Sequence, residues 1–199
     1  MELIDALAAL RDVRRDGEVV ITTMAPARDW MRLTGAAIHP LDLVLVPSAM
    51  GQATSMGLGL ALAQPNRRII VCNGDGSMLM NLGSLVSITA ESPANLTLLL
   101  FDNGVYEVTG AQPTPGGATG RRDGTTIDFV TLARACGFQS VFRFSRIDDW
   151  RPAVRGVIDA AGPTFALLDI APTHGIPGPR SPGPAAERSR KFMQALAQL

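Results

Sequence analysis

Short, uninterrupted runs of apolar residues alternate along the chain with segments of helical periodicity. Residues 67–72 read Arg-Arg-Ile-Ile-Val-Cys, and residues 96–101 read Leu-Thr-Leu-Leu-Leu-Phe. Strands that are apolar on both faces are typical of parallel sheets covered by helices on both sides. The alternation therefore predicts an α/β fold: a three-layer sandwich with a mostly parallel central sheet of five or six strands.

The expected elements follow this alternation through the whole chain. Strands are expected at 18–23, 43–46, 67–72, 96–101, 139–144 and 163–170. Helices are expected at 2–14, 27–33, 52–63, from 77 onward, 81–90, 128–136, 148–160 and 185–198. Residues 103–124 are expected to form a long loop and 171–184 an extended tail. We expect one domain over 1–184 and a C-terminal helix over 185–199.

Charge and cysteine content exclude several classes of partner. Eighteen basic and eighteen acidic residues cancel without forming blocks, which argues against a nucleic-acid or anionic-membrane partner. Cys72 and Cys136 lie far apart in apolar segments, which indicates reduced cysteines and a cytoplasmic protein. The N-terminal segment does not have the pattern of a secretory signal, and no apolar run reaches membrane-spanning length.

Two polar turns follow two of the expected strands. Gly74-Asp75-Gly76-Ser77 ends one apolar run, and Asp102-Asn103-Gly104 ends another. In an open parallel sheet, ligands bind at the carboxyl ends of the strands. Helices starting at Gln52 and at Ser77, with Ser77 as a cap, would direct backbone N–H groups toward a phosphate at this edge.

The two acids of these turns predict a cation at the same edge. Carboxylates would repel a phosphate unless a cation lay between them, and Asp75, Asp102 and a backbone carbonyl form an oxygen set suited to Mg²⁺. An Asp-Gly turn alone is equally consistent with a plain turn, and the second acid favours the ligand site. A P-loop is absent, since Lys191 is the only lysine. The glycine-rich segments 57–62 and 74–79 both lack the third glycine of a dinucleotide-binding fingerprint.

The same two turns resemble the signature of thiamine diphosphate enzymes. The segments 48–53, 102–106 and 109–114 are most similar to the diphosphate-binding half of the sulfopyruvate and phosphonopyruvate decarboxylases, and the resemblance extends over about 18–160. It implies that Asp75, Asp102 and the Gly104 carbonyl hold Mg²⁺ against the diphosphate. The sequence departs from the family pattern at Phe101-Asp102, where many members have Asn-Asn, and at Met24, which stands in place of a glycine after the first strand. It also departs at Ser48 and Ala49, in place of Gly-Ser, and at Gln52, in place of a histidine.

The resemblance also implies roles for individual residues. Cofactor contacts are expected from Thr23, Ser48, Ala49, Met50, Gly74, Asp75, Gly76, Ser77, Asp102, Gly104, Val105 and Tyr106. Met50, Gln52 and Tyr106 are the expected catalytic residues. Met50 would lie beneath the bend of the cofactor, with an ordinary core methionine as the alternative, and Gln52 stands in the position of a histidine although it has no acid–base function. The candidates for contacting substrate are Arg28, Glu107, Gln112, Arg121, Arg122 and Arg180, with His39 and His174 as weaker ones.

Enzymes of this family also need a glutamate from a separate pyrimidine-binding domain, for which this chain has no room. We therefore expect a partner subunit of similar size that supplies this glutamate, in an α2β2 or larger assembly acting on a small 2-oxo acid. The expected function is one subunit of a split thiamine diphosphate-dependent 2-oxo acid decarboxylase. The alternatives are a carboligase, the β-type subunit of a 2-oxo acid:ferredoxin oxidoreductase, which two isolated cysteines disfavour, and a non-catalytic cofactor-binding regulatory subunit.

Overall fold

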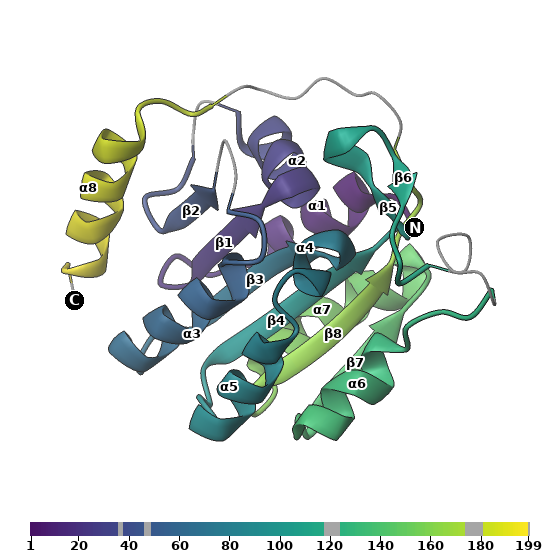
Figure 1. Ribbon diagram of the computed structural model, residues 1–199. Helices are drawn as coiled ribbons and strands as arrows, with labels where there is room; N and C mark the ends of the chain where they lie inside the picture. The colour runs from purple at the N-terminus through teal and green to yellow at the C-terminus, as the bar shows by residue number, and fades with distance from the viewer. Residues whose placement is uncertain (36–37, 46–48, 118–123, 174–180, 199) are drawn as a thin grey trace.

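A six-stranded parallel sheet forms the centre of the molecule. The computed structural model describes residues 1–35, 38–45, 49–117, 124–173 and 181–198. The strand order is β2-β1-β3-β4-β8-β7, and every neighbouring pair is parallel (Figure 1). The strands are β1 (Val19–Thr23), β2 (Asp42–Leu45), β3 (Ile69–Gly74), β4 (Leu96–Asp102), β7 (Ser140–Phe144) and β8 (Thr164–Asp169). The predicted parallel sheet is thus confirmed, with small shifts at the strand ends.

Helices cover both faces of this sheet (Figure 1). One face packs against α1 (Leu3–Val13), α2 (Met24–Thr34) and α7 (Ile147–Asp159). The other packs against α3 (Ala53–Ala63), α4 (Asp75–Leu79), α5 (Gly83–Glu91) and α6 (Phe129–Cys136). Alternate residues of a strand enter opposite cores: Ile70 and Cys72 of β3 face one layer, and Ile69 and Val71 face the other. The three-layer sandwich is confirmed.

The expected long loop after β4 contains regular structure in its first part. Strands β5 (Val105–Tyr106) and β6 (Gln112–Pro113) pair as an antiparallel hairpin that encloses the 3-10 turn η1 (Glu107–Thr109). Two-residue strands are too short to produce a recognisable alternation of apolar and polar residues, so sequence periodicity did not indicate them. This hairpin contributes to the wall of the candidate site.

The helix after β3 also differs from the expectation. It begins at Asp75 with Gly74 as its N-cap, so the prediction that Ser77 caps it was wrong. Gly74 leaves the strand with φ −91° and ψ 156°, and the helix follows at once. The Ser77 hydroxyl instead accepts a hydrogen bond from the Gly51 N–H at 3.0 Å, which joins α4 to the turn before α3.

The last helix, α8 (Ala185–Leu196), lies beside the β2 edge of the sheet (Figure 1). Its Phe192 is buried in the same core as α3 and α5.

The main-chain N–H of Ala171, where the expected tail begins, donates to the Met1 carbonyl at 2.9 Å. Among the described residues, no helix combines the length and the apolar character needed to cross a membrane.

Two glycines of α3 give a matched test of its packing on β3. A Cβ at Gly57 would come within 2.3 Å of Val71 Cγ2, whereas a Cβ at Gly59 would meet nothing within 4 Å. We expect Gly57→Ala to lower the free energy of unfolding by about 1–3 kcal/mol through overpacking. Gly59→Ala should raise it by about 0.5–1 kcal/mol through helix propensity. Urea unfolding of both variants checks this, and equal effects would contradict the tight α3–β3 contact.

Candidate functional site

Two carboxylates meet where β3 and β4 end. The strands are neighbours in register, with Gly74 opposite Phe101, so Asp75 and Asp102 come next to each other at the carboxyl edge. Their carboxyl groups lie close enough for each to affect the pKa of the other. Asp75 is buried, whereas Asp102 is half-buried and accepts a bond from the Gly104 N–H at 3.1 Å. The sheet topology thus brings the two acids together, as the sequence predicted.

Among the residues that the structure describes, no arginine, lysine or histidine forms an ion pair with Asp75 or Asp102. Burial raises the pKa of Asp75 to about 7, and the negative charge of Asp102 adds to the rise. Burial likewise raises the pKa of Asp102. Because two buried carboxylates in contact are stable only with a shared proton or a cation between them, the site is built for a positive charge.

A third residue connects the oxygen groups of this edge. Thr114, which follows β6 and is fully buried, donates from its hydroxyl to Asp75 Oδ2 at 3.3 Å. Its main-chain N–H donates to the Gly104 carbonyl at 2.8 Å. Gly104 adopts φ +69°, a conformation that favours glycine. A carbonyl oxygen has two lone pairs, so the Gly104 carbonyl can still accept a cation.

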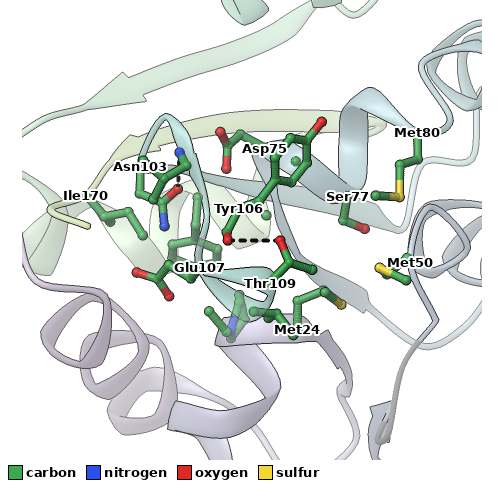
Figure 2. A pocket seen from close by; sticks show the side chains of 17 residues that line it. Met24, Met50, Asp75, Ser77, Met80, Asn103, Tyr106, Glu107, Thr109 and Ile170 are labelled. Atoms are coloured by element: carbon green, nitrogen blue, oxygen red, sulfur yellow. Dashed lines mark hydrogen bonds between the residues drawn. The ribbon is translucent and has the colours of Figure 1, made fainter. Parts of the chain in front are cut away.

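A cavity of about 60 Å³ opens beside Asp75 (Figure 2). Met50 and Met80 lie on one side of it, Asn103 and Glu107 on the other, and Tyr106 between them. The cavity is lined mainly by apolar groups, as is usual for sites of organic cofactors. Its polar groups come from the turns after β3 and β4 and from the hairpin with its 3-10 turn.

The ring of Tyr106 lies over the turn that carries Asp75. A Cβ at Gly76 would lie 2.6 Å from Tyr106 Cδ1, so only glycine allows this approach. Val105 precedes Tyr106 in β5, and both line the cavity. The Tyr106 side chain of the hairpin, which the sequence analysis named as a candidate site residue, therefore covers the Gly74–Ser77 turn.

The turn before α3 contributes Met50 to the cavity, and Met50 is 45% exposed. Its neighbour Ala49 is half-buried, and the Ala49 carbonyl accepts from the Gln52 N–H at 2.9 Å. Gln52 is the exposed N-cap of α3 and is not among the residues that line the cavity. Asn81 holds the turn from the other side by donating to the Gly51 carbonyl at 2.8 Å.

Met24, directly after β1, occupies the position where the family pattern has a glycine. Met24 has φ +57°, a conformation that costs a non-glycine residue of order 1 kcal/mol, and its side chain lines the cavity. A methionine is thus held at a backbone position better suited to glycine. Thr23, expected to contact the cofactor, is fully buried at the end of β1 and does not line the cavity.

Arg28 does not present a free positive charge to a substrate. Its guanidinium donates from Nε to Asp29 Oδ1 at 2.9 Å, and its Nη1 lies 3.6 Å from Glu107 Oε2. Glu107 also accepts at Oε1 from the Thr173 N–H, at 2.5 Å. Gln112 is exposed, bonds to Thr109 and lies outside the cavity lining. Two carboxylates thus balance the charge of Arg28 in this structure, and its role toward a substrate anion stays a prediction.

The remaining candidates lie elsewhere. His39 accepts at Nδ1 from the Leu41 N–H at 3.1 Å and lies 3.0 Å from an Arg14 nitrogen, away from the cavity lining. Burial, together with the charge of Arg14, lowers its pKa. Ser48, Arg121, Arg122, His174 and Arg180 fall outside the residues that the structure describes.

Sequence reasoning missed several residues at this edge. The only indication for Thr114 was that it lies in a segment that resembles the family, and no sequence pattern indicated Met80. Asp169, at the end of β8, lies opposite Asp102 in register and pairs with Arg143 through bonds of 2.9 and 3.0 Å. The sequence shows that Asp169 also ends an apolar run. It does not show that Arg143, on another strand, pairs with this carboxylate.

These residues fit a divalent cation and a diphosphate. Within the described part of the chain, no three His, Cys, Asp or Glu side chains are placed to hold a metal. A cation between Asp75 and Asp102 would therefore also need the Gly104 carbonyl and oxygens from a ligand or water, which is how Mg²⁺ is commonly bound with phosphates. Gly74, which precedes Asp75, leaves room for such a ligand, since a Cβ there would meet nothing within 4 Å.

Comparison with known proteins identifies the same region. Residues 32–170 match the family described as "Thiamine pyrophosphate enzyme, C-terminal TPP binding domain". The chain is 36% identical to phosphonopyruvate decarboxylase of Streptomyces viridochromogenes over 92% of its own length, but it spans only 44% of that relative. It is 37% identical to sulfopyruvate decarboxylase subunit beta of Methanothermobacter thermautotrophicus, over 86% of this chain and 83% of the relative.

The fold is shared with a solved structure of much lower identity. A protein from Mycobacterium smegmatis, described as a thiamin diphosphate-dependent enzyme, superposes with a TM-score of 0.71 at 17% identity. The match covers 86% of this chain and 32% of the other.

Proposed function

The chain belongs to the thiamine pyrophosphate enzymes, whose C-terminal TPP binding domain it forms, and from this we propose that it is the diphosphate- and magnesium-binding subunit of a split 2-oxo acid decarboxylase. The observation that carries the proposal is the pair of Asp75 and Asp102 at the edge of a mostly apolar cavity. The relative named subunit beta supports the split arrangement, because this chain spans most of it.

The roles of the residues follow from their positions. Asp75, Asp102 and the Gly104 carbonyl would hold Mg²⁺, and the Gly74–Ser77 turn would approach the diphosphate. When bound, thiamine diphosphate supplies the electron sink for loss of carbon dioxide from a 2-oxo acid. Met50, Met80 and the Tyr106 ring would exclude water from the reacting part of the cavity. Thr23, Ala49, Val105 and the Ser48 carbonyl stay expected cofactor contacts, and Gln52 stays a candidate from the family pattern alone.

A second polypeptide is needed to complete this cavity. Among the described residues, the carboxylates that line it are Asp75, beside Asp102, and Glu107, whose Oε1 accepts from Thr173 and whose Oε2 lies 3.6 Å from Arg28. Neither is free to activate a cofactor ring as a glutamate from a pyrimidine-binding α subunit would. We therefore expect such a partner in an α2β2 or larger assembly.

The surface around α3 and α5 supports such an association. Residues 50–64 and 76–90 contain no charged side chain. Met56 and Val86, on α3 and α5, are exposed, as are Met50 and Met80 at the cavity. Exposed apolar residues next to an incomplete site are typical of a protein interface. The substrate would be a small 2-oxo acid such as those of the phosphonopyruvate and sulfopyruvate decarboxylases, and the location would be cytoplasmic.

Calorimetry tests the cofactor assignment. Thiamine diphosphate titrated into the chain with its co-expressed partner subunit should bind in the presence of Mg²⁺ and bind much more weakly in EDTA. The same titration of the chain alone shows how much of the affinity depends on the partner. Absence of Mg²⁺-dependent binding in both preparations would contradict the proposed function.

A further inference from the structure

Thr114 contacts two of the three groups that would hold the cation. Its hydroxyl donates to Asp75 Oδ2 at 3.3 Å, and its N–H donates to the Gly104 carbonyl at 2.8 Å. Its own carbonyl accepts from the Gly117 N–H at 3.0 Å, so the residue is held on the hairpin side as well. One residue of the hairpin thus fixes groups that follow two different strands of the sheet.

The hydrogen bond of the Thr114 hydroxyl does not follow from burial alone. The fully buried threonines Thr22, Thr23, Thr97 and Thr164 have hydroxyl oxygens without a hydrogen-bond partner among the described residues. All four lie in strands of the central sheet. Burial in this molecule therefore leaves threonine hydroxyls unpaired at several positions, whereas the Thr114 hydroxyl reaches a carboxylate at the candidate metal site.

From this contrast we infer that Thr114 is a positioning residue for the metal site, an inference that rests on the function proposed above. The hydroxyl holds one oxygen of Asp75 and so restricts rotation of the carboxylate, which leaves Oδ1 in a defined orientation. The main-chain N–H occupies one lone pair of the Gly104 carbonyl and orients the other. Partners that orient metal ligands in this way typically change metal affinity 10- to 100-fold.

Threonine-to-valine substitution tests the hydroxyl without changing the side-chain shape. We expect Thr114→Val to weaken Mn²⁺ binding by about 10- to 100-fold. Mn²⁺ binding is measured by electron paramagnetic resonance with thiamine diphosphate and the partner subunit present. Thr114→Ser keeps the hydroxyl and should stay within about threefold of the wild type, well below that loss. Thr97→Val is the matched control, since it removes a buried hydroxyl that is unpaired among the described residues, and Mn²⁺ affinity should be unchanged.

Wild-type affinity in Thr114→Val would overturn the inference. Equal losses in Thr114→Val and Thr114→Ser would also overturn it, because the effect would then follow the shape of the side chain and not the hydroxyl. If the wild-type protein with its partner binds no Mn²⁺ in the presence of thiamine diphosphate, the proposed function itself fails. The two failures are therefore distinguishable within one set of titrations.

Discussion

Replacing Asp75 with asparagine is expected to abolish Mg²⁺-dependent binding of thiamine diphosphate and to lower turnover of the reconstituted enzyme by about a thousandfold or more. A bound cation contributes several kcal/mol of charge stabilisation in the transition state, and each 1.4 kcal/mol or so changes the rate by a factor of ten. Asp75 is buried, lies beside Asp102 and accepts a hydrogen bond from Thr114, so water has little access to replace its carboxylate.

The same substitution is expected to stabilise the cofactor-free chain at high pH. Burial raises the pKa of Asp75 to about 7, well above the value of about 3.9 in an unfolded chain. The folded state therefore binds the proton more tightly, and its stability falls as the pH rises from about 4 through 7, by up to about 4 kcal/mol. Asparagine does not ionise, so Asp75→Asn should lose the part of this dependence that Asp75 contributes, keep the part due to the raised pKa of Asp102, and exceed the wild type above pH 7.

Denaturant unfolding between pH 5 and pH 8.5 measures the stability effect, and calorimetry measures the binding effect. Asp102→Asn is the matched control for binding, because many members of the family have asparagine at that position, and it should keep Mg²⁺-dependent binding. A wild-type chain whose stability rises from pH 5 to pH 8 would contradict the buried carboxylate pair. Undiminished cofactor binding by Asp75→Asn would contradict the metal site.

Gly76→Ala is expected to damage the site through Tyr106. The added Cβ would lie 2.6 Å from Cδ1 and 2.7 Å from Cε1 of the ring, so the ring or the turn must move. Overpacking of this kind costs about 1–3 kcal/mol of stability. Because Gly76 follows Asp75 directly, we also expect about 100-fold lower turnover from the displaced ligand.

A double-mutant cycle separates this clash from other effects. In a Tyr106→Ala background the ring is absent, so Gly76→Ala should cost less than about 0.5 kcal/mol of unfolding free energy, and the two substitutions should be non-additive. Gly74→Ala is the control in the same turn, since its Cβ would meet nothing within 4 Å, and it should leave the stability of the cofactor-free chain nearly unchanged. Additive losses in the cycle would show that the ring is not the cause.

The sheet and its ligand edge could be predicted because they depend on local signals. Buried parallel strands appear in the sequence as β-branched and leucine-rich runs, and the acids at 75 and 102 mark where two of them end. Once the strands were placed side by side, the meeting of these acids followed from the topology alone. The resemblance to a family then gave the pair its chemical meaning.

The remainder of the site depends on contacts between distant segments. Thr114 approaches Asp75 only because a hairpin with two-residue strands folds back over the edge. The ion pair of Arg28 with Glu107, on that same hairpin, likewise could not be read from the sequence. The positive φ of Met24 was indicated only by the family pattern, which has a glycine at this position, and not by the residue types of this chain.

Turnover of the separate and combined subunits tests the central claim most directly, namely that this chain holds the metal and the diphosphate while another polypeptide activates the cofactor. Release of carbon dioxide from sulfopyruvate and phosphonopyruvate should be measured with thiamine diphosphate and Mg²⁺ present. We predict release from at least one substrate when chain and partner are combined, none from either alone, and none when the chain has Asp75→Asn. Turnover by the isolated chain, or full activity of the Asp75→Asn complex, would contradict the claim.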